Sequence, residues 1–71
     1  MPKLYSSAFI IKVLMQHGFV FVSQKGSHTK YRKTGNPTLT TIVPAERKEM
    51  PQGTFNSILR QSGLRKEDFE K

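Results

Sequence analysis

Apolar residues recur at helical spacing near the start of the chain. Two serines, Ser6 and Ser7, precede an apolar stripe formed by Phe9, Ile10, Val13 and Leu14. Serine hydroxyls accept hydrogen bonds from the free N–H groups of a first helical turn, and glycine commonly ends a helix in the left-handed conformation. The pattern predicts a first helix from about Ser7 to His17, ended by Gly18.

Three short segments after this helix have the composition of β-strands. Residues 19–23 are aromatic and β-branched, and because both faces are apolar, periodicity leaves open which face meets the core. A second strand is predicted from His28 to Lys33, after a Gly26-Ser27 break. A third covers residues 38–43, with a break before it and Pro44 at its end. Short connections between consecutive strands allow only hairpins, so the three form an antiparallel meander.

A second amphipathic pattern follows a polar, charged loop at residues 45–50. The segment from Pro51 to Thr54 is typical of a helix entry, with Thr54 as the expected N-cap. The buried stripe of this helix is then formed by Phe55, Ile58 and Leu59.

Gly63 is expected to end the second helix, with Leu64 packing back on the last turn. Residues 66–69 are expected to add one more turn, anchored by Phe69. The order helix, three strands, helix predicts an α+β fold in two layers, with both helices on one face of the sheet. Residues 1–71 are expected to form one domain.

Charge narrows the class of partner. The formal net charge is +7 and the pI is near 10.2, which favours nucleic acid or an acidic protein as a partner. The chain contains no cysteine, so disulfides and thiolate–metal sites are excluded. No apolar run approaches the roughly 20 residues that span a bilayer, and Met1 to Tyr5 lacks the apolar segment of a signal peptide. We therefore expect a soluble cytoplasmic protein with no membrane partner.

Basic residues concentrate around one histidine. Residues 24–33 hold four of the twelve Lys and Arg residues and one of the two histidines. On a strand, His28, Lys30 and Arg32 point to one face, and the residues between them, together with Lys33, point to the other. An imidazole moves protons near neutral pH, and the cations hold an anion in place. This face is typical of a site for a phosphate-bearing ligand.

Each residue of this segment also has a plainer interpretation. A histidine beside a Gly-Ser turn is often a solvated loop residue, and His17, in the last turn of the first helix, is better explained as a surface or capping residue. Tyr31 is more often a core or edge aromatic than a platform for stacking RNA bases. Gly26 serves backbone geometry or the close approach of a phosphate. Ser27 is favoured as a partner of backbone groups in the turn over a covalent nucleophile.

Taken in order, the motifs of the chain resemble the HicA toxins (the YcfA-like family) from about Ser7 to Phe69. The matching fragments are Gly18-Phe19, Gln24-Lys25-Gly26-Ser27-His28, Val43-Pro44, Pro51-Gln52-Gly53-Thr54 and residues 58–64. The resemblance implies a fold like that of double-stranded-RNA-binding domains, cleavage of messenger RNA, and inhibition by a HicB antitoxin encoded beside the toxin. It places the active histidine at His28. Many members carry another histidine shortly after the Val-Pro pair, where this chain has Ala45-Glu46-Arg47.

The residues of the motif fit cleavage without a metal. RNA carries its own nucleophile, the 2′-hydroxyl, and His28 is the one residue of the motif whose unperturbed pKa suits proton transfer near neutral pH. The neighbouring cations can stabilise the charge that develops on phosphorus. Of the five acidic residues, three crowd the C-terminal tail, whereas Mg²⁺ sites need carboxylates near the phosphate. We expect neither a metal nor another cofactor.

The sequence thus predicts a metal-independent endoribonuclease toxin with His28 as general acid or base. The residues expected to contact RNA are Lys25, Gly26, Ser27, Lys30, Arg32 and Lys33. Two other hypotheses remain: an RNA-binding module without chemistry, and an inactive component of a regulatory complex that docks an acidic protein. We expect the antitoxin to cover His28 and to bury Tyr31 or a neighbouring apolar side chain.

Overall fold

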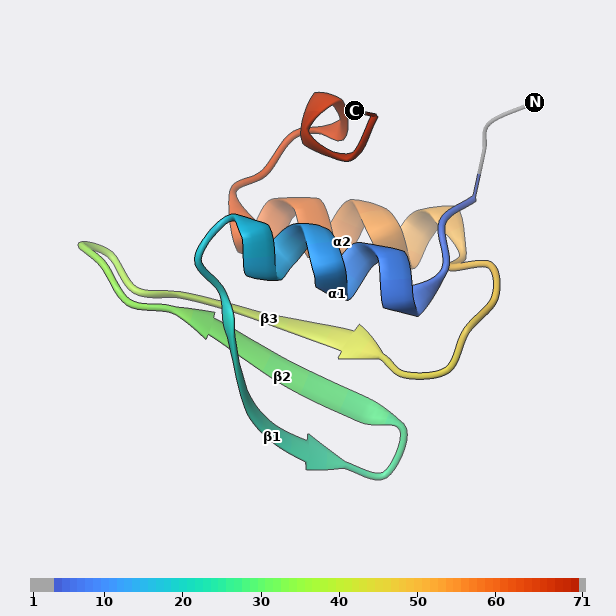
Figure 1. The fold of residues 1–71 in the computed structure, drawn as a ribbon, viewed down its shortest axis with the longest axis horizontal. Helices are drawn as coiled ribbons and strands as arrows, with labels where there is room; N and C mark the ends of the chain where they lie inside the picture. Colours follow the sequence, from blue (N-terminus) through green and yellow to red (C-terminus); the bar gives the residue numbers. More distant parts are fainter. Residues whose placement is uncertain (1–3, 71) are drawn as a thin grey trace.

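The computed structural model describes residues 4–70. The outermost residues of the expected domain, 1–3 and 71, lie outside the described part of the chain, as does most of the Met1–Tyr5 stretch. The elements follow the predicted order (Figure 1): α1 (Ser7–Gln16), β1 (Val20–Lys25), β2 (His28–Lys33), β3 (Leu39–Pro44), α2 (Gln52–Ser62) and the short 3₁₀ helix η1 (Lys66–Phe69).

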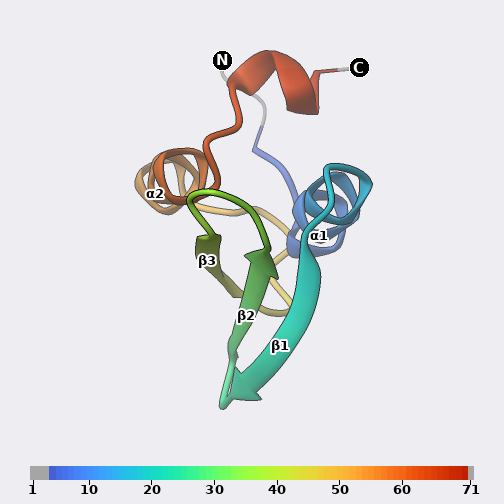
Figure 2. The same cartoon turned by 90° about the vertical axis from the view of Figure 1, so that its left-hand side faces the viewer.

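The three strands form one antiparallel sheet in the order β1-β2-β3. Both α-helices lie over the same face of this sheet, as the two views show (Figures 1 and 2), and no other described element covers the opposite face. The predicted α+β architecture in two layers is confirmed. Its likeness to double-stranded-RNA-binding domains stays a prediction.

The core lies between the helices and the covered face of the sheet. The apolar stripes of the two helices supply half of its buried apolar residues, at the spacing that the sequence predicts, although Phe9 and Leu59 of these stripes are only partly buried. The buried apolar residues are Ile10, Val13, Leu14, Phe19, Tyr31, Val43, Met50, Phe55, Ile58 and Phe69. Met50 is a correction to the sequence analysis, because it belongs to the loop expected to be polar and charged, yet it is only 1% exposed.

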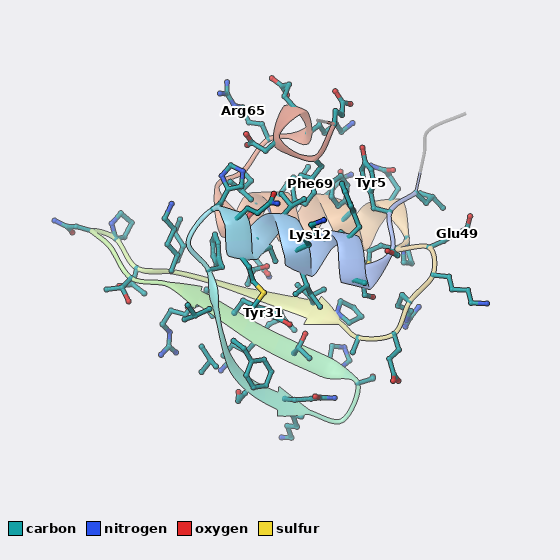
Figure 3. The ribbon with its side chains drawn as sticks, in the orientation of Figure 1. Tyr5, Lys12, Tyr31, Glu49, Arg65 and Phe69 are labelled. Carbon is teal, nitrogen blue, oxygen red and sulfur yellow. The ribbon has the colours of Figure 1, made fainter. Side chains whose placement is uncertain are left out.

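An aromatic cluster fastens η1 to the helices. The Tyr5 ring lies 5.0 Å from the ring of Phe9, 5.4 Å from that of Phe55 and 6.1 Å from that of Phe69, measured between centroids. Tyr5 and Phe69 lie side by side above the helices (Figure 3). The predicted C-terminal turn anchored by Phe69 is therefore confirmed, as a 3₁₀ helix.

The helix ends follow the predicted signals with one exception. Ser6 Oγ accepts a hydrogen bond from the Phe9 N–H at 3.2 Å, and Gly63 adopts the left-handed conformation with φ 73°. Thr54 is not the N-cap of α2, however. The helix begins at Gln52 with Pro51 as its cap, because the Pro51 carbonyl accepts the first helical bond, from Phe55 N–H at 2.9 Å.

The strand boundaries also differ from those expected. β1 begins and ends later, at Val20 and Lys25, because Phe19 turns into the core and donates its N–H to the Leu14 carbonyl. β3 extends from Leu39 to Pro44, so the proline is its last residue and does not lie beyond it. Within residues 4–70, no helix is long and apolar enough to cross a membrane.

Candidate nucleic-acid interface

The face of the sheet opposite the helices carries the histidine and its cations. Thr29 and Tyr31 alternate with His28, Lys30 and Arg32 along β2, and the first two are buried under the helices. His28 and Arg32 are exposed, and Lys30 is half-buried. Since side chains of a strand alternate between faces, the predicted separation of the two sets is confirmed. We call the exposed set, with Lys25, the basic face.

A β-bulge in β1 adds Lys25 to the basic face. Phe21 pairs with Tyr31, but the next paired residue is Ser23, which lies opposite Lys30, so the pairing skips Val22. The extra residue shifts the rest of the strand by one position and brings Lys25 directly opposite His28. Without the bulge, Gln24 and not Lys25 would lie opposite His28. Side chains directly opposite each other share a face and have Cβ atoms about 4.5–5.5 Å apart, so the bulge sets an ammonium beside the imidazole.

The turn between β1 and β2 contains two residues, Gly26 and Ser27. Gly26 has φ 60°, and an added Cβ would meet no atom within 4 Å, so the glycine is required for its backbone conformation and not for space. The Gln24 side chain donates from Nε2 to the Gly26 carbonyl at 2.9 Å. On the other side, the Ser27 carbonyl accepts from the Ala45 N–H at 2.6 Å. The turn is therefore tied both to β1 and to the loop after β3.

Ser7 of α1 holds that loop in place through three hydrogen bonds, a role that the sequence analysis missed. Its hydroxyl donates to the Pro44 carbonyl at 2.7 Å and accepts from the Arg47 N–H at 2.9 Å, and its own N–H donates to the Arg47 carbonyl at 2.8 Å. Ser7 is only 2% exposed. Between the two anchored residues lie Ala45 and Glu46, and Glu46 has φ 58°. No sequence signal marks these contacts, which join residues 37 to 40 positions apart.

Other basic and titratable residues lie apart from the basic face. Lys33 is on the opposite side of β2, and its aliphatic chain lies under Gly18, where an added Cβ would come within 3.4 Å of Lys33 Cε. Of the predicted RNA contacts, Lys33 is thus the one that the sheet separates from His28. His17 is the C-cap of α1, as its plainer interpretation predicts. Lys48 and Arg60 lie on the loop after β3 and on α2.

The structure confirms the interpretation of Tyr31 as a core aromatic and corrects the expectation that the antitoxin buries it. This side chain is 5% exposed and lies on the covered face, so it is neither a stacking platform for bases nor available for burial by a partner. Exposed apolar side chains lie on β1 instead, at Val20 (59% exposed), Phe21 (52%) and Val22 (37%), and on α1 at Met15 (52%). The strand whose faces periodicity could not assign is exposed at all six positions.

The residue types of the basic face suit the binding of a phosphate and proton exchange with a hydroxyl group beside it. Lys25, Lys30 and Arg32 supply hydrogen-bond donors with fixed charge, and the exposed His28 can act as acceptor or donor. Among residues 4–70, no group of three or more His, Cys, Asp or Glu side chains is placed to hold a metal ion.

The fold and this face define a small α+β protein with a cationic sheet surface around one exposed histidine. A family model described as the HicA toxin of bacterial toxin–antitoxin systems matches residues 9–64. The chain belongs to the HicA toxin family, as the resemblance of its motifs predicts. No curated protein matches the sequence. The family assigns the chain a toxin role in a toxin–antitoxin system.

Proposed function

We propose that this toxin is an endoribonuclease that cleaves messenger RNA without a metal, with His28 as general acid or base. The observation that carries the proposal is the position of His28, which is exposed on the open face of the sheet, directly opposite Lys25 and on the same face of β2 as Lys30 and Arg32. A phosphodiester held by these cations brings its 2′-hydroxyl or its leaving oxygen to the imidazole. Proton transfer by one positioned group contributes about 10² to 10⁴ in rate.

Charge stabilisation is the second contribution of the basic face. The phosphorane formed by 2′-oxygen attack carries more negative charge than the starting diester, and fixed cations beside it lower the barrier. Lys25, Lys30 and Arg32 take this role, and the Gly26-Ser27 turn lets the backbone approach the phosphate closely. Lys33, on the other side of the sheet, contributes general attraction to RNA and no direct contact at the reacting phosphate.

The experiment is cleavage of a long single-stranded RNA in excess chelator. Wild-type protein cuts the RNA under these conditions, and the products end in 2′,3′-cyclic phosphates because the nucleophile is internal. Cutting that stops when chelator is added contradicts a metal-free mechanism. RNA that is bound but never cut favours the module without chemistry, and a protein that binds no RNA favours an inactive component that docks an acidic protein.

We further propose that the antitoxin is a HicB-type protein with an acidic contact surface, and that both proteins act in the cytoplasm, where messenger RNA is translated. The net charge of +7 speeds association with an acidic surface, and tight inhibition needs desolvated apolar contacts as well. The exposed apolar side chains of β1, which begin opposite Arg32, offer such contacts on the same strand as Lys25.

Of the two edge strands of the sheet, β1 is better placed than β3 to contact the antitoxin. The outer edge of β3 is capped, because Gln61 Oε1 on α2 accepts from the Ile42 N–H at 3.1 Å and from Thr41 Oγ1 at 2.9 Å. β1 is the other edge strand, and no helix or loop among residues 4–70 covers it in Figure 2. An uncovered edge with apolar side chains accepts a strand from another chain.

The antitoxin proposal is tested by co-expression with the acidic protein encoded beside this gene. In the purified complex His28 is protected from carbethoxylation, while His17 stays as reactive as in the free toxin. Val20→Thr, which keeps strand propensity and removes apolar surface, weakens the complex and leaves cleavage by the free protein unchanged. A complex that leaves His28 fully reactive shows that inhibition works by some route other than covering the site.

A further inference from the structure

Glu46 has a backbone conformation that glutamate rarely adopts. Its φ is 58°, and among residues 4–70 every other residue with positive φ is a glycine. A side chain at this φ crowds the following carbonyl, so the left-handed region is normally occupied by glycine, asparagine or aspartate. Such strain persists only where the surroundings hold it, and it gathers at functional sites. A functional role would explain why the chain keeps a glutamate in this conformation.

Two anchors hold Glu46 in this conformation. On one side the Ala45 N–H donates to the Ser27 carbonyl, which ties the loop to the turn before His28. On the other side the buried Ser7 binds Arg47 through two hydrogen bonds, of 2.8 and 2.9 Å. The backbone on each side of Glu46 is thus fixed, and only its exposed side chain is free to move.

The loop places Glu46 at the same end of the sheet as His28. His28 pairs with Pro44 in the β2–β3 ladder, and Glu46 follows two residues later. The ladder ends at Pro44, and the bond from the Ala45 N–H to the Ser27 carbonyl keeps the start of the loop beside the turn that precedes His28.

We propose that Glu46 is a second catalytic residue of this site, the base that accepts the 2′-hydroxyl proton while His28 acts as the acid. This rests on the proposed function of the chain as an endoribonuclease. An ionised carboxylate only accepts hydrogen bonds, whereas an imidazolium only donates them, so the two side chains suit opposite ends of the reaction. Lys25, opposite His28, balances the charge of the phosphorane.

The step balances without another reactant. The ribose 2′-oxygen forms a bond to phosphorus, and its proton passes to the Glu46 carboxylate. The bond between phosphorus and the 5′-oxygen breaks, and that oxygen takes a proton from the His28 imidazolium. The products are a 2′,3′-cyclic phosphate and a 5′-hydroxyl, and proton exchange with water restores both side chains.

The test uses sulfur in place of the leaving oxygen. Cleavage positions are first mapped on a long RNA, and a short RNA is then made with the scissile linkage in two forms, with a 5′-oxygen or a 5′-sulfur. A thiolate leaves without being protonated, so the sulfur substrate removes the need for an acid and keeps the need for a base. Single-turnover rates at saturating RNA, in chelator, separate chemistry from binding.

Glu46→Gln is expected to cut the oxygen substrate about 10²-fold or more slowly than wild type, since it keeps the shape of the side chain and removes the base. Glu49→Gln is the matched control, because Glu49 is an exposed glutamate of the same loop that points outward in Figure 3. It is expected to cut at the wild-type rate. With the sulfur substrate, the defect of His28→Ala largely disappears and the defect of Glu46→Gln remains.

The outcomes separate the proposal from the function on which it rests. If wild-type protein cuts no RNA, both fail. If it cuts and Glu46→Gln matches Glu49→Gln, or if sulfur restores Glu46→Gln, the role of Glu46 as base is overturned and the ribonuclease stands. Glu46→Gly supplies a readout without activity: it relieves the positive φ and is expected to raise the Tm while abolishing fast cleavage. An unchanged or lower Tm contradicts the strain from which the inference starts.

Discussion

The two faces of the sheet are built from alternating residues of the same strands, yet they carry opposite kinds of side chain. On the covered face of β2, Thr29 and Tyr31 are buried, and Thr29 Oγ1 donates to the Val43 carbonyl at 2.8 Å. On the open face, His28 and Arg32 are exposed. The covered face stabilises the fold, and the open face is free to carry charge that a core would not tolerate. Substitutions on the covered face should therefore lower the free energy of unfolding, whereas substitutions on the open face should change RNA binding and cleavage.

The largest effect on stability is expected from Tyr31→Ala. This change removes a buried ring that also makes an edge contact with Phe21, at 5.9 Å between centroids. Large-to-small changes of buried aromatics cost about 3–5 kcal/mol, a large share of the roughly 4–10 kcal/mol expected for a domain of this size. Urea denaturation checks the prediction. A loss below about 1 kcal/mol would mean that the ring is not part of the core.

A smaller loss of stability is expected from Gln61→Ala. Its side-chain oxygen accepts both hydrogen bonds at the edge of β3, and the Thr41 hydroxyl that donates one of them is 0% exposed. Leaving a buried donor unsatisfied costs about 1–3 kcal/mol. Gln16→Ala, at an exposed position of α1, is the control and should change the free energy of unfolding by less than about 0.5 kcal/mol. Equal effects in the two variants would contradict the capping role of Gln61.

On the open face, Arg32→Ala should leave stability unchanged and weaken RNA binding. Each phosphate contact contributes about −0.7 to the slope of log affinity against log salt for single strands, so the slope should flatten by about 0.7. Fluorescence anisotropy of labelled single-stranded RNA over a salt series measures this, in a His28→Ala background that prevents cleavage. A slope near zero before any substitution would mean that the basic face does not contact RNA.

The smallest effect is expected from Lys33→Ala. Lys33 shares its strand and charge with Arg32 but lies on the other side of the sheet, next to Gly18. It should flatten the salt slope less than Arg32→Ala does, as should changes at Lys48 and Arg60. If Lys33 and Arg32 contribute equally, RNA contacts both sides of β2 and the division between the faces does not hold for binding.

The sequence predicts most of the fold because its signals are local. The apolar stripes, Gly18 and Gly63 define the helices, and the alternation in β2 correctly separates His28 from Tyr31. Each of these features depends on residues within a few positions of one another.

The candidate site was less predictable because its geometry depends on pairing between distant segments. The bulge at Val22 determines which β1 residue faces His28, and a one-residue shift would place Gln24 there. The anchoring of the loop after β3 by Ser7 likewise joins residues far apart in sequence. The exposure of β1 could not be predicted for a different reason. An apolar run on both faces is typical of a buried strand, whereas β1 lies at an uncovered edge of the sheet.

The most direct test of the account compares the two histidines. His28→Ala and His17→Ala are assayed for cleavage of long single-stranded RNA in excess chelator, with unfolding measured in parallel. His28 is an exposed strand residue, so its substitution should change stability by less than about 0.5 kcal/mol and slow cleavage by about 10² to 10⁴. His17→Ala should cut at the wild-type rate. Cleavage by folded His28→Ala at the wild-type rate would contradict the assignment of the basic face as the catalytic site.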